Sequence, residues 1–315
     1  MYFEIEGGGT MRKFSRRKFL QHASVTGGLS LLAPPVFSKI SLGGASLTTI
    51  SDGHLVLPLS FAIGANPEAK AIEILRDHGI SGDQVRPSCN VSIYQDGTNT
   101  VLFDVGAGPD FMPSAGTLLD SLSTIGVAPE DVTHILITHA HPDHIWGLLD
   151  DFDEPLFANA AHLIGRKEWD YWWDPDTVHS IGQARMTFAA GARRRFEIME
   201  DSFERFDDGQ EVVSGISAVA TYGHTPGHMS FEVRSGNRAC LIIGDAIANH
   251  HLAFQKPEWP SGSDQDPDLG IRTRLALFDR IVTDDLSVVG FHFPGTGLGR
   301  VEKTSSAYKF IEETT

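Results

Sequence analysis

The sequence predicts one mixed α/β domain over residues 46–315, in which helices cover β-sheets. Strand-like runs dominate both halves of this segment, and helical patterns lie between them. No internal repeat and no low-complexity linker separates the halves, which favours one domain over two. A hydrophobic content of 41% is typical of an ordinary globular core.

Apolar alternation and turn residues define the elements of the first half. The turn residues Asp52-Gly53 separate two predicted strands, and Gly79 ends a predicted helix. The sequence "QDGTN" is typical of a hairpin tip between two β-rich runs. The predicted segments are 47–59 (two strands), 67–79 (helix), 89–108 (hairpin), 117–126 (helix) and 133–138 (buried strand).

The second half begins with a strand that turns into an aromatic-rich helix and then returns to strands. A long loop over residues 249–268 precedes the last predicted helix. The predicted segments are 161–176 (strand and helix), 182–199 (helix), 215–223, 228–236 and 238–246 (strands), 271–283 (helix) and 286–295 (the last strand).

Residues 1–45 comprise an N-terminal extension followed by a segment, 11–45, with the layout of an export signal: a cationic start, an apolar run and small residues. Within them "SRRKFL" (15–20) resembles a twin-arginine signal, although a surface basic cluster is the alternative. We expect translation to start at Met11 and cleavage to occur near Ala45. The mature protein is therefore expected in the periplasm or outside the cell, without a membrane span, because the apolar run is short and broken by Pro34-Pro35.

The charge balance argues against nucleic-acid partners. The chain has 25 basic and 41 acidic residues and a formal net charge of -16. Nucleic-acid binding requires a basic face, so a small-molecule substrate is the expected partner.

Several predicted strands end on a residue that can bind a metal ion. The densest group is "HAHPDH" (139–144), directly after the apolar run "HILI". Because loops at the ends of strands gather at one edge of a sheet, these side chains are expected to meet there. The other strand-end residues are Asp104, His224, Asp245 and His292.

The spacing within this group suggests two metal ions. In an extended segment His139 and His141 point to the same side and can share one ion. Pro142 ends the strand pattern, so Asp143 and His144 project around the turn toward a second ion. Imidazole and carboxylate ligands suit zinc and neighbouring divalent metals. The alternative is that these histidines are unrelated surface or core residues with no shared metal.

These motifs resemble those of the metallo-β-lactamase superfamily. The resemblance rests on "THAHPDH", "GHTPGH" and the strand-end residues Asp245 and His292. It implies an αββα four-layer sandwich and a centre of two divalent ions, expected to be Zn2+. It also implies the ligand sets, which are His139, His141 and His224 for one ion, Asp143, His144 and His292 for the other, and Asp245 as a bridge.

The resemblance implies a hydrolase in which a hydroxide shared by the two ions attacks the substrate. Asp143 and Asp245 are the expected catalytic residues, since they hold the metals and can orient this hydroxide. Asp104 is expected to accept the spare N–H of a histidine ligand, and His228 to support the site from behind.

Within the superfamily the chain is most similar to the exported methyl parathion hydrolase group and its lactonase relatives. The resemblance rests on "TTISDG", "NHHLAFQKPEW" and "HFPGTGLGRV". It implies an ester, lactone or phosphotriester substrate, a possible homodimer, and a leaving-group pocket lined by Trp172, with Phe111 and Phe188 as weaker candidates. His250 and His251 could also face the cleft.

Two alternative functions stay open at this point. A mononuclear iron persulfide dioxygenase would need fewer ligands than the seven positions filled here, and a metal-dependent binding protein would need no turnover. Members that use a cysteine ligand are disfavoured, because no cysteine lies near the motifs in the sequence. Cys89 and Cys240 are expected to be buried free thiols, with a disulfide as the alternative.

Overall fold

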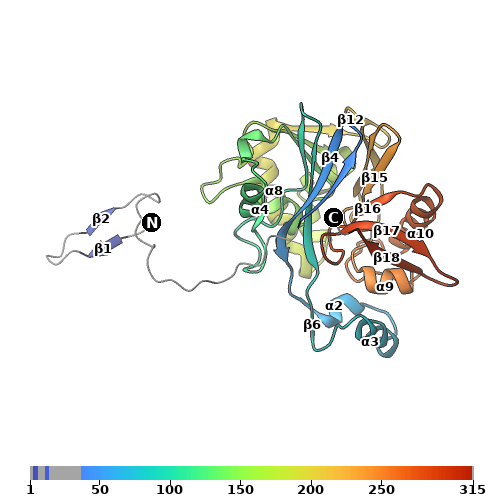
Figure 1. Cartoon of the computed structure of the whole chain (residues 1–315). Coiled ribbons are helices and arrows are strands. Elements are labelled where there is room, and N and C mark those ends of the chain that lie inside the picture. The colour runs from blue at the N-terminus through green and yellow to red at the C-terminus, as the bar shows by residue number, and fades with distance from the viewer. Residues whose placement is uncertain (1–2, 6–10, 14–36, 314–315) are drawn as a thin grey trace. The chain divides into compact units, whose positions relative to one another are not determined.

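The computed structural model describes residues 3–5, 11–13 and 37–313 (Figure 1). The chain divides into two units, Met1–Pro34 and Pro35–Thr315. In the smaller unit β1 (Phe3–Ile5) pairs antiparallel with β2 (Met11–Lys13). The predicted twin-arginine sequence at 15–20 lies outside the described residues, so the export signal stays a prediction.

The larger unit contains two seven-stranded sheets. The first sheet has the order β11 (Phe203–Phe206), β10 (Ala161–Gly165), β9 (His134–Ile137), β8 (Thr100–Phe103), β7 (Ser88–Gln95), β4 (Ala45–His54) and β3 (Ser38–Leu42). The second has the order β12 (Glu211–Val213), β13 (Ile216–Ala220), β14 (Met229–Ser235), β15 (Arg238–Ile242), β16 (Ser287–Val289), β17 (Leu298–Lys303) and β18 (Tyr308–Glu312).

The two sheets pack face to face. Alternate residues of each strand point to opposite faces, and one face of each sheet contributes to a shared apolar core. Leu136 of β9 lies in this core, whereas Ile135 and Ile137 point to the opposite face. The rings of Phe103 and Phe231, from different sheets, lie 5.5 Å apart. The sheets therefore form the two inner layers of a sandwich.

Helices cover both outer faces, which confirms the predicted αββα sandwich (Figure 1). Amphipathic helices bury their apolar stripes against the first sheet, and others do so against the second. The helices on the first sheet are α4 (Leu118–Thr124), α6 (Arg166–Trp173) and α8 (Met186–Met199). Those on the second are α9 (His250–Gln255) and α10 (Pro267–Thr283). The short helices α5 (Pro142–Ile145) and α7 (Thr177–Ser180) complete this part of the chain.

A small separate layer joins β4 to β7. It consists of β5 (Leu57–Pro58), α2 (Leu59–Ile63), α3 (Glu68–Asp77) and β6 (Gln84–Val85). Ile74 and Leu75 of α3 pack with Leu252 of α9 in an apolar cluster of their own. This layer supplies one wall of the cavity described below. No helix in the described part of the chain has the length and hydrophobicity to cross a membrane.

Two sequence predictions differ from the structure. The predicted turn at Asp52-Gly53 is wrong, because β4 continues through it with a shift of register between Ser51 and His54. The segment 286–295 is not the last strand, since β17 and β18 follow it and complete the sheet. The strand β3 lies before residue 46 and pairs with β4 along the edge of the first sheet, and the domain boundary at residue 46 stays a prediction.

Candidate metal centre

The histidine-rich loop follows β9, a buried strand between the parallel strands β8 and β10. Parallel neighbours direct their carboxyl ends to one sheet edge, and the loop emerges there. His141 is still extended, with φ -72° and ψ 158°, and Pro142 then begins α5. Proline suits this first helical position because it needs no N–H bond and has a suitable φ. Asp143 and His144 consequently lie in the first turn of a helix.

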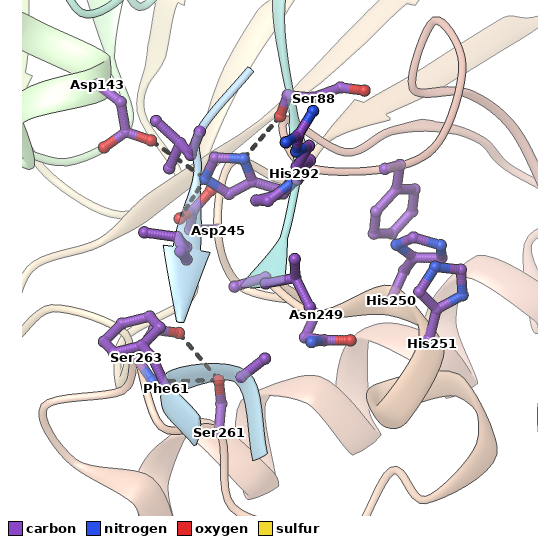
Figure 2. Close-up of a pocket in the computed structure, with 18 of the residues that line it drawn as sticks. Phe61, Ser88, Asp143, Asp245, Asn249, His250, His251, Ser261, Ser263 and His292 are labelled. Atoms are coloured by element: carbon purple, nitrogen blue, oxygen red, sulfur yellow. Dashed lines mark hydrogen bonds and ion pairs between the residues drawn. The ribbon is translucent and has the colours of Figure 1, made fainter. Parts of the chain in front are cut away.

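The second sheet supplies the remaining three predicted ligand residues from loops after its strands. His224 follows β13, Asp245 follows β15, and His292 follows β16. Figure 2 shows Asp143, Asp245 and His292 converging from these separate segments. The structure thus brings together all seven side chains that the sequence analysis assigned to the metal ions.

Three histidines form one half of the site. Nε2 of His139 and Nε2 of His224 each lie 3.0 Å from Nδ1 of His141. Burial and the neighbouring imidazoles hold the pKa of His139 and His141 well below the ordinary value, so these rings are neutral. Neutral ring nitrogens that converge this closely present lone pairs to a common point.

Carboxylates dominate the other half. His292 Nε2 lies 3.1 Å from Asp143 Oδ2 and 3.3 Å from Asp245 Oδ2. His144 Nε2 lies 3.4 Å from Asp245 Oδ1. Burial lowers the pKa of His144, but the charges of Asp143, Asp245 and Asp104 outweigh it and raise this pKa to about 10. Asp245 Oδ2 also lies 3.4 Å from His224 Nε2, so this residue borders both halves.

Four of the five histidines share an arrangement that suits metal binding. In each, Nδ1 can donate to a fixed acceptor, which leaves the lone pair of Nε2 directed at the site. The acceptors are Thr138 Oγ1 for His139 (3.1 Å), Asp104 Oδ2 for His144 (2.7 Å), Asp264 Oδ1 for His224 (3.3 Å) and the Ser88 carbonyl for His292 (2.7 Å).

Unpartnered polar atoms support the same conclusion. Within the described part of the chain, His144 Nε2 and Asp245 Oδ1 are buried without a hydrogen-bond partner. Such atoms are rare in folded proteins, because an unsatisfied buried polar group is costly. Groups of histidine and carboxylate donors within 4.8 Å of one another could hold metal ions, and imidazole with carboxylate suits divalent ions of the zinc type.

Asp104 and His228 lie behind the converging groups. Asp104 accepts from the backbone N–H and the hydroxyl of Thr138 as well as from His144, and its own backbone has a positive φ of 64°. His228 Nε2 accepts the backbone N–H of Asp245 at 3.0 Å, so the structure places this ring against the loop that presents Asp245.

The sequence analysis missed two buried carboxylates beside the site. Asp264 lies 3.3 Å from Nδ1 of His224, and the side chain of Glu168 contacts both histidine-bearing loops. Asp264 stands among several acidic residues of a long loop, so the sequence offers nothing that singles it out. Glu168 could have been found, because it stands on the apolar face of a helix, directly before Trp169 and one turn before Trp172.

A cavity of about 740 Å³ opens onto the converging residues. His141, Asp143, His224, Asp245 and His292 are among its lining residues, and Figure 2 shows Asp143, Asp245 and His292 close together. Apolar side chains contribute much of the remaining wall, together with His250 and His251, as the sequence analysis considered. The apolar residues are Leu55, Leu57, Phe61, Ile80, Val85, Phe111, Phe188 and Phe293.

Trp172 differs from its sequence-based assignment. It is almost fully buried and is not among the described residues that line this cavity, unlike Phe111 and Phe188. Its ring lies edge-on to His141 with 5.7 Å between centroids, and its Nε1 donates to Glu168 at 2.6 Å. The indole therefore packs against His141 and Glu168 and does not form a wall of this cavity.

Cys89 also differs from expectation, because its sulfur lies within 4.8 Å of ligand-type atoms of Asp143 and His292. The distance along the sequence had hidden this proximity. Burial raises the pKa of the Cys89 thiol to about 12, which keeps it protonated. Both Cys89 and Cys240 are free thiols, which confirms that expectation.

The fold and this arrangement match known proteins. Residues 85–291 match the family described as the metallo-beta-lactamase superfamily. The chain belongs to this superfamily. The membership predicted from the motifs is thereby confirmed.

Relatives within the superfamily include lactonases. N-acyl homoserine lactonase AttM of Agrobacterium fabrum is 30% identical over 128 residues, which cover 40% of this chain and 44% of AttM. The chain thus matches less than half the length of this curated relative.

Two solved structures of the superfamily cover far more of the chain. AidC, described as a dizinc quorum-quenching lactonase in complex with a product, is 25% identical, covers 90% of this chain and 99% of its own, and has a TM-score of 0.82. The hydrolase AbOPH is 26% identical, covers 89% and 98%, and has a TM-score of 0.83. Over most of its length the chain is therefore similar to solved structures described as a dizinc lactonase and a hydrolase.

Proposed function

We propose that this chain is a two-metal hydrolase that opens a lactone or cleaves a related ester. The convergence of seven buried imidazole and carboxylate side chains, five of which line the cavity, carries the proposal. The similarity to AttM and AidC, both described as lactonases, supports the lactone over other bonds.

The residues fit two divalent ions of the zinc type. His139, His141 and His224 would hold one ion, and Asp143, His144 and His292 would hold the other, with Asp245 beside both. When bound, such ions lower the pKa of water and polarise a carbonyl oxygen. The acceptors beside Nδ1 of four histidines keep each ring in the tautomer whose Nε2 lone pair is free to bind a metal.

The protein's own side chains complete the reaction site. Asp143 Oδ2, at the end of the cavity, would accept a proton from an attacking water and orient it toward the scissile carbonyl. Phe111 and Phe188 would exclude bulk water from one side of the substrate, since both line the cavity. The apolar wall would bind the substrate's hydrocarbon portion.

Metal analysis combined with a substrate screen tests this function. Purified protein should contain two equivalents of divalent metal and should open acyl lactones, with p-nitrophenyl esters and a phosphotriester as comparison substrates. Removing the metal with a chelator should abolish turnover, and adding Zn2+ should restore it. A fully metallated protein that hydrolyses none of these compounds would contradict the proposal.

Export is a separate proposal supported by "SRRKFL" at 15–20 and the cationic segment around it. Replacing Arg16 and Arg17 with lysines should retain the protein in the cytoplasm, as measured by cell fractionation. A homodimer likewise stays a prediction, and sedimentation of the purified protein tests it.

A further inference from the structure

Glu168 is a buried carboxylate that accepts four hydrogen bonds. Its side chain is fully enclosed, although it belongs to the short helix α6, whose neighbouring Lys167 is exposed. Burial raises the pKa of the carboxyl, whereas the donors around it lower that pKa. A buried carboxylate with both oxygens occupied needs a specific set of partners, and the identity of those partners is informative.

The first pair of donors comes from the histidine-rich loop and from Trp172, which packs beside that loop. The backbone N–H of Ala140, between His139 and His141, donates to Oε1 at 2.9 Å. Nε1 of Trp172 donates to the same oxygen at 2.6 Å. The Trp172 ring is the one that lies edge-on to His141.

The second pair of donors belongs to the loop that carries His224. The hydroxyl of Thr225 donates to Oε2 at 2.7 Å, and the backbone N–H of Gly227 donates to it at 3.0 Å. A Cβ atom added at Gly227 would lie 2.1 Å from the backbone nitrogen of Glu168, so only glycine permits this approach. The loop therefore packs directly against the start of α6.

One carboxylate thus joins two loops that come from different sheets. Ala140 and Gly227 are separated by more than eighty positions in the chain, yet each contributes a backbone donor to opposite oxygens of one side chain. Both loops present residues to the three-histidine half of the site. The first loop continues into Asp143 and His144, but within the described part of the chain Glu168 makes no hydrogen bond to either residue or to His292.

We propose that Glu168 is a positioning residue that fixes His139, His141 and His224 in a common geometry by holding their two loops together. This inference rests on the proposed function, because it assigns a purpose to the proposed ligands. Loss of the hydrogen bonds from Glu168 should weaken metal binding by His139, His141 and His224 selectively and leave the other site nearly intact. A purely structural role would instead lower the stability of the fold without a difference between the two sites.

Glu168→Gln tests this role with little change of shape. An amide has a single acceptor oxygen, so its NH2 group would face two donors, either Ala140 and Trp172 or Thr225 and Gly227. Asp170→Asn is the matched control, because Asp170 is an exposed carboxylate on the same helix. Zn2+ titration against a chromophoric chelator, well below the melting temperature of each variant, measures both dissociation constants.

Glu168→Gln should weaken one of the two Zn2+ sites on the order of 10- to 100-fold and lower kcat for lactone opening more than it changes KM. Asp170→Asn should match the unmodified protein in both measurements. Equal Zn2+ affinity of Glu168→Gln and the unmodified protein at both sites would overturn the inference while leaving the proposed function intact. An unmodified protein that binds no Zn2+ would instead overturn the proposed function and the inference with it.

Thr225→Val provides a second test if Glu168→Gln does not fold. Valine keeps the volume of Thr225 and removes only one of the four donors to Glu168. The same Zn2+ site should weaken by several-fold, and the other should not change. Two unchanged dissociation constants in a folded Thr225→Val protein would also contradict the role.

Discussion

The two halves of the candidate metal centre are built from different chemistry. Imidazoles make up the three-histidine half, where burial and neighbouring rings depress the pKa of His139 and His141. In the carboxylate half, Asp143 and Asp245 raise the pKa of His144 to about 10 despite its burial. The two halves therefore differ in the charge of their ligand side chains, although both border Asp245. The loops of the three-histidine half are in addition hydrogen-bonded to Glu168.

The two halves also differ in how closely a carboxylate contacts the Nδ1 side of a histidine. His144 has a carboxylate acceptor, Asp104, at 2.7 Å on its Nδ1 side, whereas the corresponding Asp264 lies 3.3 Å from His224. A neighbouring ion pair holds the carboxylate half directly. In the three-histidine half the carboxylate contacts are longer, at 3.4 Å from His224 to Asp245 and 3.3 Å to Asp264, and Glu168 bonds to the two loops that carry its histidines.

Removing the residue shared by the halves should have the largest effect. Asp245→Ala deletes the carboxylate that lies 3.4 Å from both His144 Nε2 and His224 Nε2. Lactone opening should fall by at least about a thousandfold, because several kcal/mol of metal-derived activation would be lost. Steady-state kinetics and metal content measure this, with circular dichroism as the control for folding. Full activity in a folded Asp245→Ala protein would refute the two-metal mechanism.

Replacing the carboxylates that accept hydrogen bonds from the histidines, Asp104 and Asp264, should lower activity by different amounts in the two halves. Asp104→Asn should lower activity by about 10- to 100-fold, because Asp104 accepts from His144 and also from Thr138. Asp264→Asn should cost less, since its bond to His224 is longer. Parallel kcat and Zn2+ measurements on the two variants make the comparison. A greater loss of activity in Asp264→Asn than in Asp104→Asn would contradict this prediction.

Trp172 distinguishes support of the site from contact with substrate. Trp172→Phe keeps an aromatic ring beside His141 but removes the donor to Glu168. Stability should fall by about 1.5–3 kcal/mol, the usual value for a hydrogen bond to a charged group, with little change in KM. Urea denaturation and kinetics give both numbers. A large rise in KM at unchanged stability would restore Trp172 to the substrate pocket.

The thiols should give the smallest response. Burial raises the pKa of Cys89 to about 12 and also raises the pKa of Cys240. At pH 8 the thiolate fraction of Cys89 would be about one in ten thousand, so neither thiol should react with a disulfide reagent until the protein unfolds. Rapid labelling of one thiol in the folded protein would show that Cys89, beside the carboxylate half, is more accessible than its burial indicates.

The sequence by itself determined the sandwich and the residues that converge in it. The apolar run "HILI", the proline that begins α5 and the ligand types at strand ends are local properties, which can be read within a few neighbouring positions. The family follows from the same local motifs, since His139 to His144 and the later strand ends occur in a characteristic order.

Only the tertiary structure decided which side chains support those residues. Glu168, Asp264 and Cys89 lie far along the chain from the groups that they contact, and no local period encodes such contacts. The same limit explains Trp172, whose helical spacing is identical for a cavity wall and for a buried support. The turn predicted at Asp52-Gly53 failed for a related reason, because pairing of β4 with β7 overrides the local preference of aspartate and glycine.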